Sequence, residues 1–428
     1  MIMNKTIIML ATAVLAMATT TACSSSDDGT KAGTLEYGNG TPVEKIVLNS
    51  AEQTMVANGN QAGLKMLKAE EKAMAGKSFV MSPLSAGYLL GMLHEGTQGQ
   101  TQQEIAQALG FSGNDAKTVS AYFKKMLTTA PAVDNDVKLT IANAIYGNTA
   151  TEVAFTETFV QAMKDSYLTE PQSLDFSQPT ALQAINSWCS QQTNGLIKEL
   201  MAADEFNADA SAYLLNAMYF KALWSRPFDK SKTRKEAFTM EDGQQKDVNM
   251  MYRQASTGFW ADDDMKAASL PYGKGDYMMT IVLPNEGSGL QTADVIARLA
   301  DGTWQQIVAR TQSNQTTMGI AIPRFRTEAK TDLKALLMEL GIHKIFTDEG
   351  DFAPMLKKSD NVSVSKMFQK AVVEVDEDGT QAASASASEM AVSADLSDNM
   401  FKANRPFVFV IHEKSTNAIF FMGQFTGK

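Results

Sequence analysis

The 428-residue chain is poor in cysteine and histidine. Its two cysteines are Cys23 and Cys189, and its three histidines are His94, His343 and His412. Two cysteines provide no disulfide framework, so a chain of this length has to be held together by an apolar core. No histidine belongs to a motif such as H-E-x-x-H, and we therefore expect neither a metal site nor a cofactor.

Long apolar runs and an excess of positive charge are also missing. The net charge is −10, with 44% hydrophobic and 20% charged residues, as in ordinary soluble domains. A negative chain offers no electrostatic footprint for nucleic acid, so we expect no nucleic-acid partner. The pair Lys124-Lys125 fits the solvated surface of a helix.

Catalytic motifs are equally scarce. The sequence contains no G-x-S-x-G nucleophile elbow and no G-x-x-x-x-G-K-[ST] phosphate loop. The acidic segment 374–379 resembles a calcium loop, but its twelfth position is Ala385 instead of the bidentate Glu that such a loop requires. We therefore do not expect an enzyme. A hydrolase with a dispersed Ser-His-Asp triad stays an alternative, because triad members need not be neighbours in sequence.

Residues 1–22 have the pattern of a signal peptide. Lys5 supplies a positive charge, and residues 7–18 form an apolar stretch too short to span a bilayer, which needs ~20 residues. Residues 20–23 read Thr-Thr-Ala-Cys, which resembles the lipobox of bacterial lipoproteins except that Thr20 replaces the usual Leu. An ordinary secretory signal with an incidental cysteine is the alternative, and either pattern predicts export.

A lipobox implies cleavage before Cys23 and attachment of acyl chains to that cysteine. Residues 23–44 are polar and rich in Gly, Ser and Asp, which is typical of a flexible tether. We expect a lipid-anchored protein at the bacterial outer membrane, facing either the periplasm or the outside. Cys189 lies in a helix-like segment and is interpreted as a buried, inert thiol.

Residues 45–428 form the body of the chain, in which helical and strand-like segments mix without strict alternation. The helical segments cover 185–195 and 331–341, and a Gly closes each of them. The strand-like runs cover 213–220, 277–283, 407–412 and 418–425. Helices prevail early and strands late, and the last two strands form a hairpin, which together predict one large α+β domain.

One segment fits neither pattern. Residues 377–388 read Glu-Asp-Gly-Thr-Gln-Ala-Ala-Ser-Ala-Ser-Ala-Ser, between strand-like segments at 364–377 and 405–413. Connections between elements usually have 2–6 residues, whereas more than twenty separate these two strand patterns. A long connection of small side chains is either a flexible linker without a role of its own or a segment that moves as part of the protein's function.

Six segments of the body resemble, in order, those of the serpins, a family of protease inhibitors. They begin with a Ser-Pro-Leu-Ser helix start and cover 79–105, 185–200, 214–224, 270–290, 322–342 and 404–425. The resemblance implies the serpin fold, an α+β fold with a large central β-sheet, further sheets and surrounding helices. It also implies an exposed reactive-centre loop near the C-terminus, here about residues 377–396.

The resemblance makes the Ala/Ser run the hinge at which this loop enters the central sheet. The hinge comprises Glu377, Gly379, Thr380, Ala382, Ala383, Ser384 and Ala385. Alternate residues of a strand point to one face, and the row that points inward is Thr380, Ala382, Ser384, Ser386, Ser388 and Met390. All but Met390 are small, so the sequence allows insertion with little steric strain and little loss of side-chain entropy.

For an inhibitory serpin the implied mechanism is suicide inhibition. A target protease attacks the loop and forms a covalent acyl-enzyme, after which the loop inserts and the protease is trapped. We expect a monomeric chain whose partner is that protease. A non-inhibitory serpin that acts as a decoy or a binding module is the alternative, although such relatives often carry bulky or charged hinge residues.

The family's residue count places the reactive bond between Ser393 and Ala394. Counting back from residues 404–407 instead gives Asp395, and Val392 and Leu396 also stay candidates. Residues 380–401 contain no Lys or Arg, and a trypsin-like pocket requires a cation. Elastase-like or subtilisin-like serine proteases are therefore the expected targets, and papain-like cysteine proteases are a further class.

Two more groups of residues follow from the resemblance. The shutter, where the sheet opens, comprises Ser82, Ser85, Asn216 and Gln369, and Gln369 stands where serpins usually have a His. Gln does not titrate near neutral pH, so we expect no histidine-driven pH response at this opening. The breach, at the top of the sheet where insertion begins, comprises Trp224, Thr233 and Phe238.

Overall fold

The computed structural model describes residues 45–74, 76–111, 116–151, 153–359, 362–364, 366–380 and 399–428. They all belong to one unit that extends over Tyr37–Lys428. The expected signal peptide, Cys23 and the whole tether lie outside the described residues, as do residues 381–398 with four hinge positions and the expected reactive bond. Within the described ranges, no helix is both long and apolar enough to cross a membrane.

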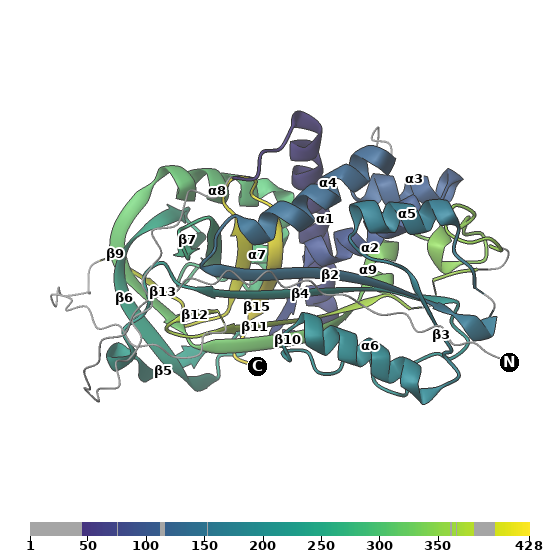
Figure 1. Cartoon of the computed structure of the whole chain (residues 1–428). Coiled ribbons are helices and arrows are strands. Elements are labelled where there is room, and N and C mark those ends of the chain that lie inside the picture. Colours follow the sequence, from purple (N-terminus) through teal and green to yellow (C-terminus); the bar gives the residue numbers. More distant parts are fainter. Residues whose placement is uncertain are drawn as a thin grey trace, which may run out of the picture. The chain divides into compact units, whose positions relative to one another are not determined.

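A six-stranded sheet carries the point at which the loop begins. Its strand order is β10-β11-β12-β4-β2-β3, and these strands run side by side in Figure 1. Their bounds are β2 Val137–Asn148, β3 Gln172–Leu174, β4 Ala212–Leu223, β10 Phe325–Asp332, β11 Phe368–Val375 and β12 Gly379–Thr380. Within the part of the chain that the structure describes, β4 and β11 are joined only through the two residues of β12.

A nine-stranded sheet contains the C-terminal hairpin. Its order is β1-β15-β14-β8-β7-β6-β9-β13, and β5 pairs with β6 off this path. The bounds are β1 Phe79–Met81, β5 Arg234–Thr239, β6 Gln245–Ala261, β7 Met265–Tyr272, β8 Tyr277–Pro284, β9 Gln315–Pro323, β13 Met400–Lys402, β14 Phe407–Glu413 and β15 Ile419–Phe425. β13 lies beyond the loop and pairs with β9, so the two ends of the loop are fixed in different sheets.

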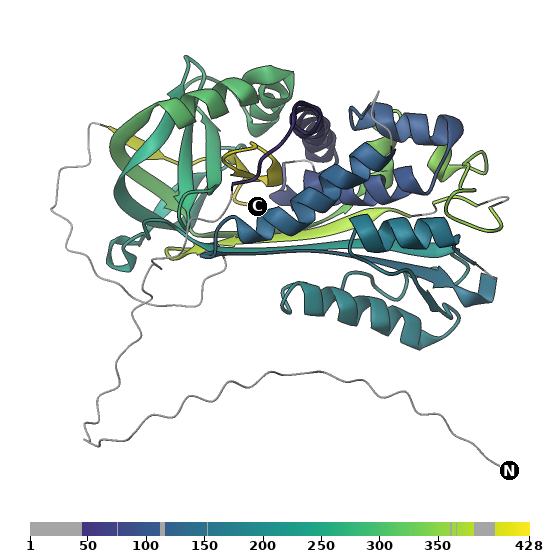
Figure 2. The same ribbon diagram turned by 45° about the horizontal axis from the view of Figure 1, so that its top comes forward.

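Helices cover both faces of the six-stranded sheet, and α7 and α8 pack against the nine-stranded sheet. Their bounds are α1 Ser50–Met74, α2 Pro83–Glu95, α3 Gly99–Ala108, α4 Ala116–Thr129, α5 Glu157–Ser166, α6 Pro179–Gln192, α7 Thr292–Arg298, α8 Trp304–Ser313 and α9 Leu333–Glu339. Figure 2 shows α6 on one face of this sheet and α2 with α4 on the opposite face.

Alternate residues of β4 face two separate apolar clusters, as the pleat requires. Leu215 and Ala217 pack with Cys189 beneath α6. Met218 and Phe220 belong to the main core on the other side of the sheet. Burial raises the pKa of the Cys189 thiol to about 11, which keeps it protonated near neutral pH and agrees with its interpretation as an inert core residue.

The predicted α+β class is confirmed, and the differences lie at element boundaries. The helix expected over 185–195 begins earlier, at Pro179, because a proline suits the first helical turn, where its missing N–H is not needed. The helix expected over 331–341 begins at Leu333, where the Asp332 side chain accepts a hydrogen bond from the Lys334 N–H. Gly341, at φ +91°, stands just beyond its end, as predicted.

A buried polar network crosses the nine-stranded sheet. His412 Nε2 lies 3.0 Å from Thr280 Oγ1, which lies 2.8 Å from Ser269 Oγ. The imidazole is 1% exposed and packs edge-on against Trp304 at 5.2 Å. Burial lowers the pKa of His412 from 6.5 to about 4, so the ring is neutral in the folded protein near pH 7.

We predict an acid-sensitive stability from this histidine. Because its folded pKa lies below the unfolded value, its contribution is fully present above pH 6.5 and is lost as the pH falls towards 4. Between pH 7 and pH 5 the free energy of unfolding should fall by about 1–2 kcal/mol more in the wild type than in His412→Gln. Denaturant titrations at both pH values test this, and parallel losses in the two proteins would contradict it.

Candidate functional site

The start of the loop already lies inside the six-stranded sheet. Gly379 pairs with Leu223 and Thr380 with Ala222 of β4, while Thr380 pairs with Val375 of β11 on its other side. Gly379 has to be a glycine, because a Cβ there would lie 2.0 Å from the carbonyl oxygen of Ala222. The loop therefore begins as a strand of two residues between β4 and β11.

Thr380 is hydrogen-bonded to one member of a stacked aromatic pair, Tyr272 and Trp224. Its Oγ1 lies 2.6 Å from the hydroxyl of Tyr272, and the Tyr272 ring stacks on Trp224 with centroids 4.3 Å apart and planes 8° apart. The Trp224 indole N–H donates to the carbonyl oxygen of Asp376 at 2.9 Å, and its backbone N–H donates to that of Asp378 at 2.8 Å. Trp224 thus binds the turn that leads into β12.

Glu377, in the same turn, makes the charged contacts of the hinge. Thr233 Oγ1 donates to its carboxylate at 2.7 Å, and a guanidinium nitrogen of Arg324 donates to it at 2.6 Å. The Glu377 side chain is only 1% exposed, whereas that of Arg324 is 48% exposed. Burial raises the pKa of Glu377, but the bonds from Thr233 and Arg324 outweigh it and hold this pKa below its usual value.

The rest of the turn is fixed by its own acidic residues. The Asp376 side chain accepts from the backbone N–H groups of Asp378 and Gly379 at 2.9 and 3.1 Å. Lys230 Nζ donates to Asp378 at 2.7 Å. Burial raises the pKa of Asp376, which these two backbone bonds offset only in part. The segment once compared with a calcium loop is therefore a hydrogen-bonded turn.

The structure places the breach residues in two locations. Trp224 and Thr233 contact the hinge directly, as described above. Phe238 lies in β5 and packs edge-on against Phe425 of β15 with ring centroids 5.3 Å apart. Phe425 also contacts Phe407, so Phe238 belongs to the aromatic core of the nine-stranded sheet.

The shutter residues come together below the hinge. The backbone N–H of Ser82 donates to Gln369 Oε1 at 2.9 Å, and that of Ser85 donates to Ser82 Oγ at 3.1 Å. Ser85 Oγ donates to Asn216 Oδ1, and Asn216 Nδ2 donates to Asn143 Oδ1 at 2.9 Å. This chain of bonds ties α2 to β11, β4 and β2. The Nε2 of Gln369 is buried and has no hydrogen-bond partner.

Three residues of the site were not predicted from the sequence. Tyr272, Arg324 and Asn143 each make a contact that fixes a predicted residue, but they come from distant strands and belong to no local pattern. Tyr272 and Arg324 carried a signal, as each lies in one of the six segments quoted for the resemblance. In the described part of the chain, no cluster of His, Cys, Asp and Glu could hold a metal ion.

A sequence profile of the serpins, the serine protease inhibitors, matches residues 57–427. The chain belongs to the serpin family. It is 30% identical over 356 residues to serine protease inhibitor 42Dd of Drosophila melanogaster, and the match covers 82% of this chain and 92% of the relative.

Solved serpin structures are similar to the chain as well. Native protease nexin-1 with heparin is 28% identical, with a TM-score of 0.76 and coverage of 88% of this chain and 99% of that one. A complex of thyroxine-binding globulin with thyroxine is 25% identical, with a TM-score of 0.76 and coverage of 86% and 98%. The serpin thus has relatives named as protease inhibitors and one solved with a small ligand.

We predict that Arg324→Met destabilises the hinge at neutral pH. The change leaves the buried Glu377 carboxylate without its cation, and we expect a loss of about 1–3 kcal/mol at pH 7. Because the folded wild type holds this pKa below 4.5, the stabilisation is fully present above pH 4.5 and is lost as the pH falls through the lowered value, so the difference should shrink at pH 3. Denaturation midpoints at pH 7 and 3 measure it, and a difference that is equal at both pH values would contradict the role of this ion pair.

Proposed function

We propose that this serpin inhibits a protease by cleavage and insertion of its reactive-centre loop. The observation that supports the proposal most directly is β12, because the first residues of the loop already pair with β4 and β11. Cleavage further along the loop would free the chain to continue in the same direction. The acyl-enzyme would then be carried with it and held in a distorted state.

The small side chains of the loop fit the space between β4 and β11 into which the loop would insert. Continuing the register of β12 places Ala382 opposite Phe220 and Ser384 opposite Met218, two residues that face the main core. Small side chains enter such a space with little strain. A serpin without inhibitory activity has no need of this row, so its composition favours inhibition over the alternative of a decoy or binding module.

The expected target class comes from the other half of the loop. We propose that the protease cleaves the bond between Ser393 and Ala394, or a neighbouring bond within residues 392–396. Its small and apolar side chains suit elastase-like or subtilisin-like serine proteases, and papain-like cysteine proteases are a further class. Thyroxine-binding globulin is named for a bound small ligand, and so binding without inhibition is the second candidate function.

We predict that Thr380→Arg converts the inhibitor into a substrate. Thr380 is 2% exposed and points at Tyr272, so an arginine cannot enter there without burying an unpaired charge. The matched control is Gln381→Arg, because the register places this residue on the outer face, opposite the partly exposed Lys221 and the exposed Glu374. The control should inhibit like the wild type.

Incubation with elastase-like, subtilisin-like and papain-like proteases, followed by denaturing gels, distinguishes the possibilities. Wild type and Gln381→Arg should give a stable covalent complex with at least one serine protease, whereas Thr380→Arg should give cleaved protein and active protease. Cleavage of the wild type with no loss of protease activity would favour the decoy. Unchanged inhibition by Thr380→Arg would overturn the insertion mechanism.

We also propose that the serpin is exported and lipid-anchored through Cys23. The proposal rests on the apolar segment 7–18 and the lipobox-like residues that end at Cys23. Acyl chains on this cysteine would drive the protein into a detergent phase, since each buried CH₂ contributes ~0.8 kcal/mol. Phase partition of the expressed chain should place the wild type in detergent and Cys23→Ser in water. A wild type that stays in water would overturn the anchor.

A further inference from the structure

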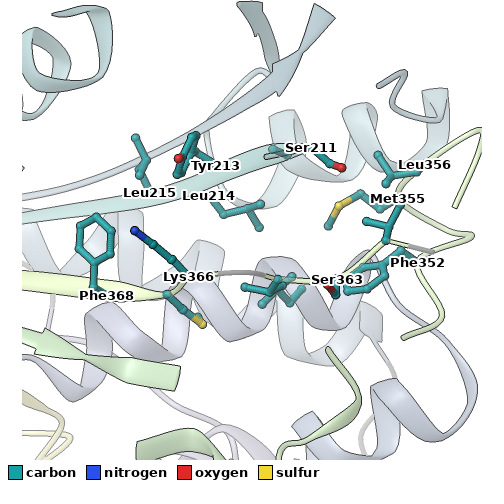
Figure 3. A pocket seen from close by; sticks show the side chains of 15 residues that line it. Ser211, Tyr213, Leu214, Leu215, Phe352, Met355, Leu356, Ser363, Lys366 and Phe368 are labelled. Atoms are coloured by element: carbon teal, nitrogen blue, oxygen red, sulfur yellow. The ribbon is translucent and has the colours of Figure 1, made fainter. Parts of the chain in front are cut away.

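The cavity shown in Figure 3 lies where β4 begins, at the opposite end of this strand from the hinge. Residues 211–215 line it on one side, and residues 362–364 and 366–368 line it across the gap that the loop would enter. Its place in this gap makes it part of the proposed function. The charges around the hinge are a separate feature, at the other end of β4, where Gly379 pairs with Leu223.

A basic segment follows β4 at this end. Residues 226–235 carry five cations and one acidic residue, so their net charge is +4 in a chain whose net charge is −10. All five cations are exposed, namely Arg226, Lys230, Lys232, Arg234 and Lys235. A patch whose sign is opposite to that of the whole chain attracts an acidic surface locally, although the chain as a whole repels one.

Ion pairs place this basic segment beside the strands at which the loop begins and ends. Lys230 Nζ lies 2.7 Å from a carboxylate oxygen of Asp378, immediately before β12. Glu236 accepts from Arg234 at 2.6 Å and from Lys402 of β13, beyond the loop, at 2.7 Å. Figure 1 shows β5, β12 and β13 at the same end of this unit. A protease that holds the loop between these strands therefore faces the basic segment.

Two of the five cations are available to a partner. The other three each lie within ion-pair distance of a carboxylate. Among the described residues, neither Arg226 nor Lys235 has such a carboxylate. Arg226 also lies beside a further cation, Arg253 of β6, whose Nη1 donates to the carbonyl oxygen of Arg226. Three basic side chains next to the loop thus have no acidic partner within the described part of the chain.

Arg253 is a buried guanidinium with an unused donor. The residue is 8% exposed, and its Nε is buried with no hydrogen-bond partner in the described ranges. Its guanidinium carbon lies 4.5 Å from the ring centre of Phe228 and 5.6 Å from that of Trp224, so aromatic faces compensate for part of its lost hydration. Burial, and after it the charge of Arg226, lower the pKa of Arg253 to about 9. A carboxylate next to the two arginines would relieve this repulsion and form charge-assisted hydrogen bonds.

We propose that Arg226, Arg253 and Lys235 form a docking site for acidic side chains on the surface of the target protease. The inference rests on the proposed function and deepens it, because it adds a contact outside the loop that selects the protease by its charge. One carboxylate of the protease would pair with Arg226 beside Arg253, and Lys235 of β5 would attract a second. A polyanion would instead need an extended row of free cations, whereas three of the five exposed ones are already paired.

The test uses one elastase-like protease in two forms, native and with its lysines succinylated, which makes its surface acidic. The rate of attack on the loop is the summed rate of covalent complex and cleaved serpin, divided by the rate of the same protease form on a small neutral peptide. At low salt we expect the succinylated form to attack the wild type about tenfold faster than the native form, and this preference should disappear at high salt. A chain of net charge −10 without a docking site should show the opposite preference.

Two charge-reversal variants locate the effect. The double variant Arg226→Glu/Lys235→Glu should lose the preference for the succinylated form. The matched control Lys65→Glu/Lys68→Glu changes the net charge equally at exposed positions of α1 and should keep it. Neither variant should have a lower denaturation midpoint than the wild type, which shows that both fold.

Slower attack on the wild type by the succinylated form, or a preference that the control loses equally, would overturn the docking site. Equal rates for the two forms, with retention of the wild type but not of Arg226→Glu/Lys235→Glu on a heparin column, would overturn it in favour of a polyanion. Cleavage without a covalent complex would refute the proposed function alone, because the rate of attack includes cleavage and still reports on the docking site.

Discussion

The six-stranded sheet depends on one constraint: two of its long strands, β4 and β11, have no ladder of their own within the described residues. They are joined through β12, which has two residues, and α2 links them through the side chains of the shutter. Backbone N–H and C=O groups along a strand need partners. A strand that fills the gap supplies such partners on both sides, and the loop that follows β12 has the length and composition to become that strand.

The contacts of the hinge residues fix the start of the loop between β4 and β11. Trp224 binds the turn through two hydrogen bonds, Arg324 forms an ion pair with the buried Glu377, to which Thr233 also donates a hydrogen bond, and Tyr272 is hydrogen-bonded to Thr380. These contacts fix the loop's first residues in register with β4 and β11. The same register predicts the inserted state, because every further residue has an assigned place between the two strands.

Much of this could be predicted from the sequence, and the limits have physical causes. The inward row of small residues and the shutter set of Ser82, Ser85, Asn216 and Gln369 follow from local pattern and resemblance, and the structure brings the four shutter residues together. The contacts of Arg324 and Tyr272 with the hinge could not be predicted, because they join strands far apart in sequence. Phe238 was assigned by the resemblance as well, and the structure places it in β5, packed against Phe425 of β15.

Hydrogen–deuterium exchange before and after cleavage of the loop tests the central claim most directly. The amides of residues 214–220 on β4 and 368–373 on β11 are the ones that would gain a new neighbouring strand. The account predicts that their exchange slows strongly in the cleaved protein, while that of β14 and β15 stays the same. Equal exchange on β4 and β11 before and after cleavage would contradict it.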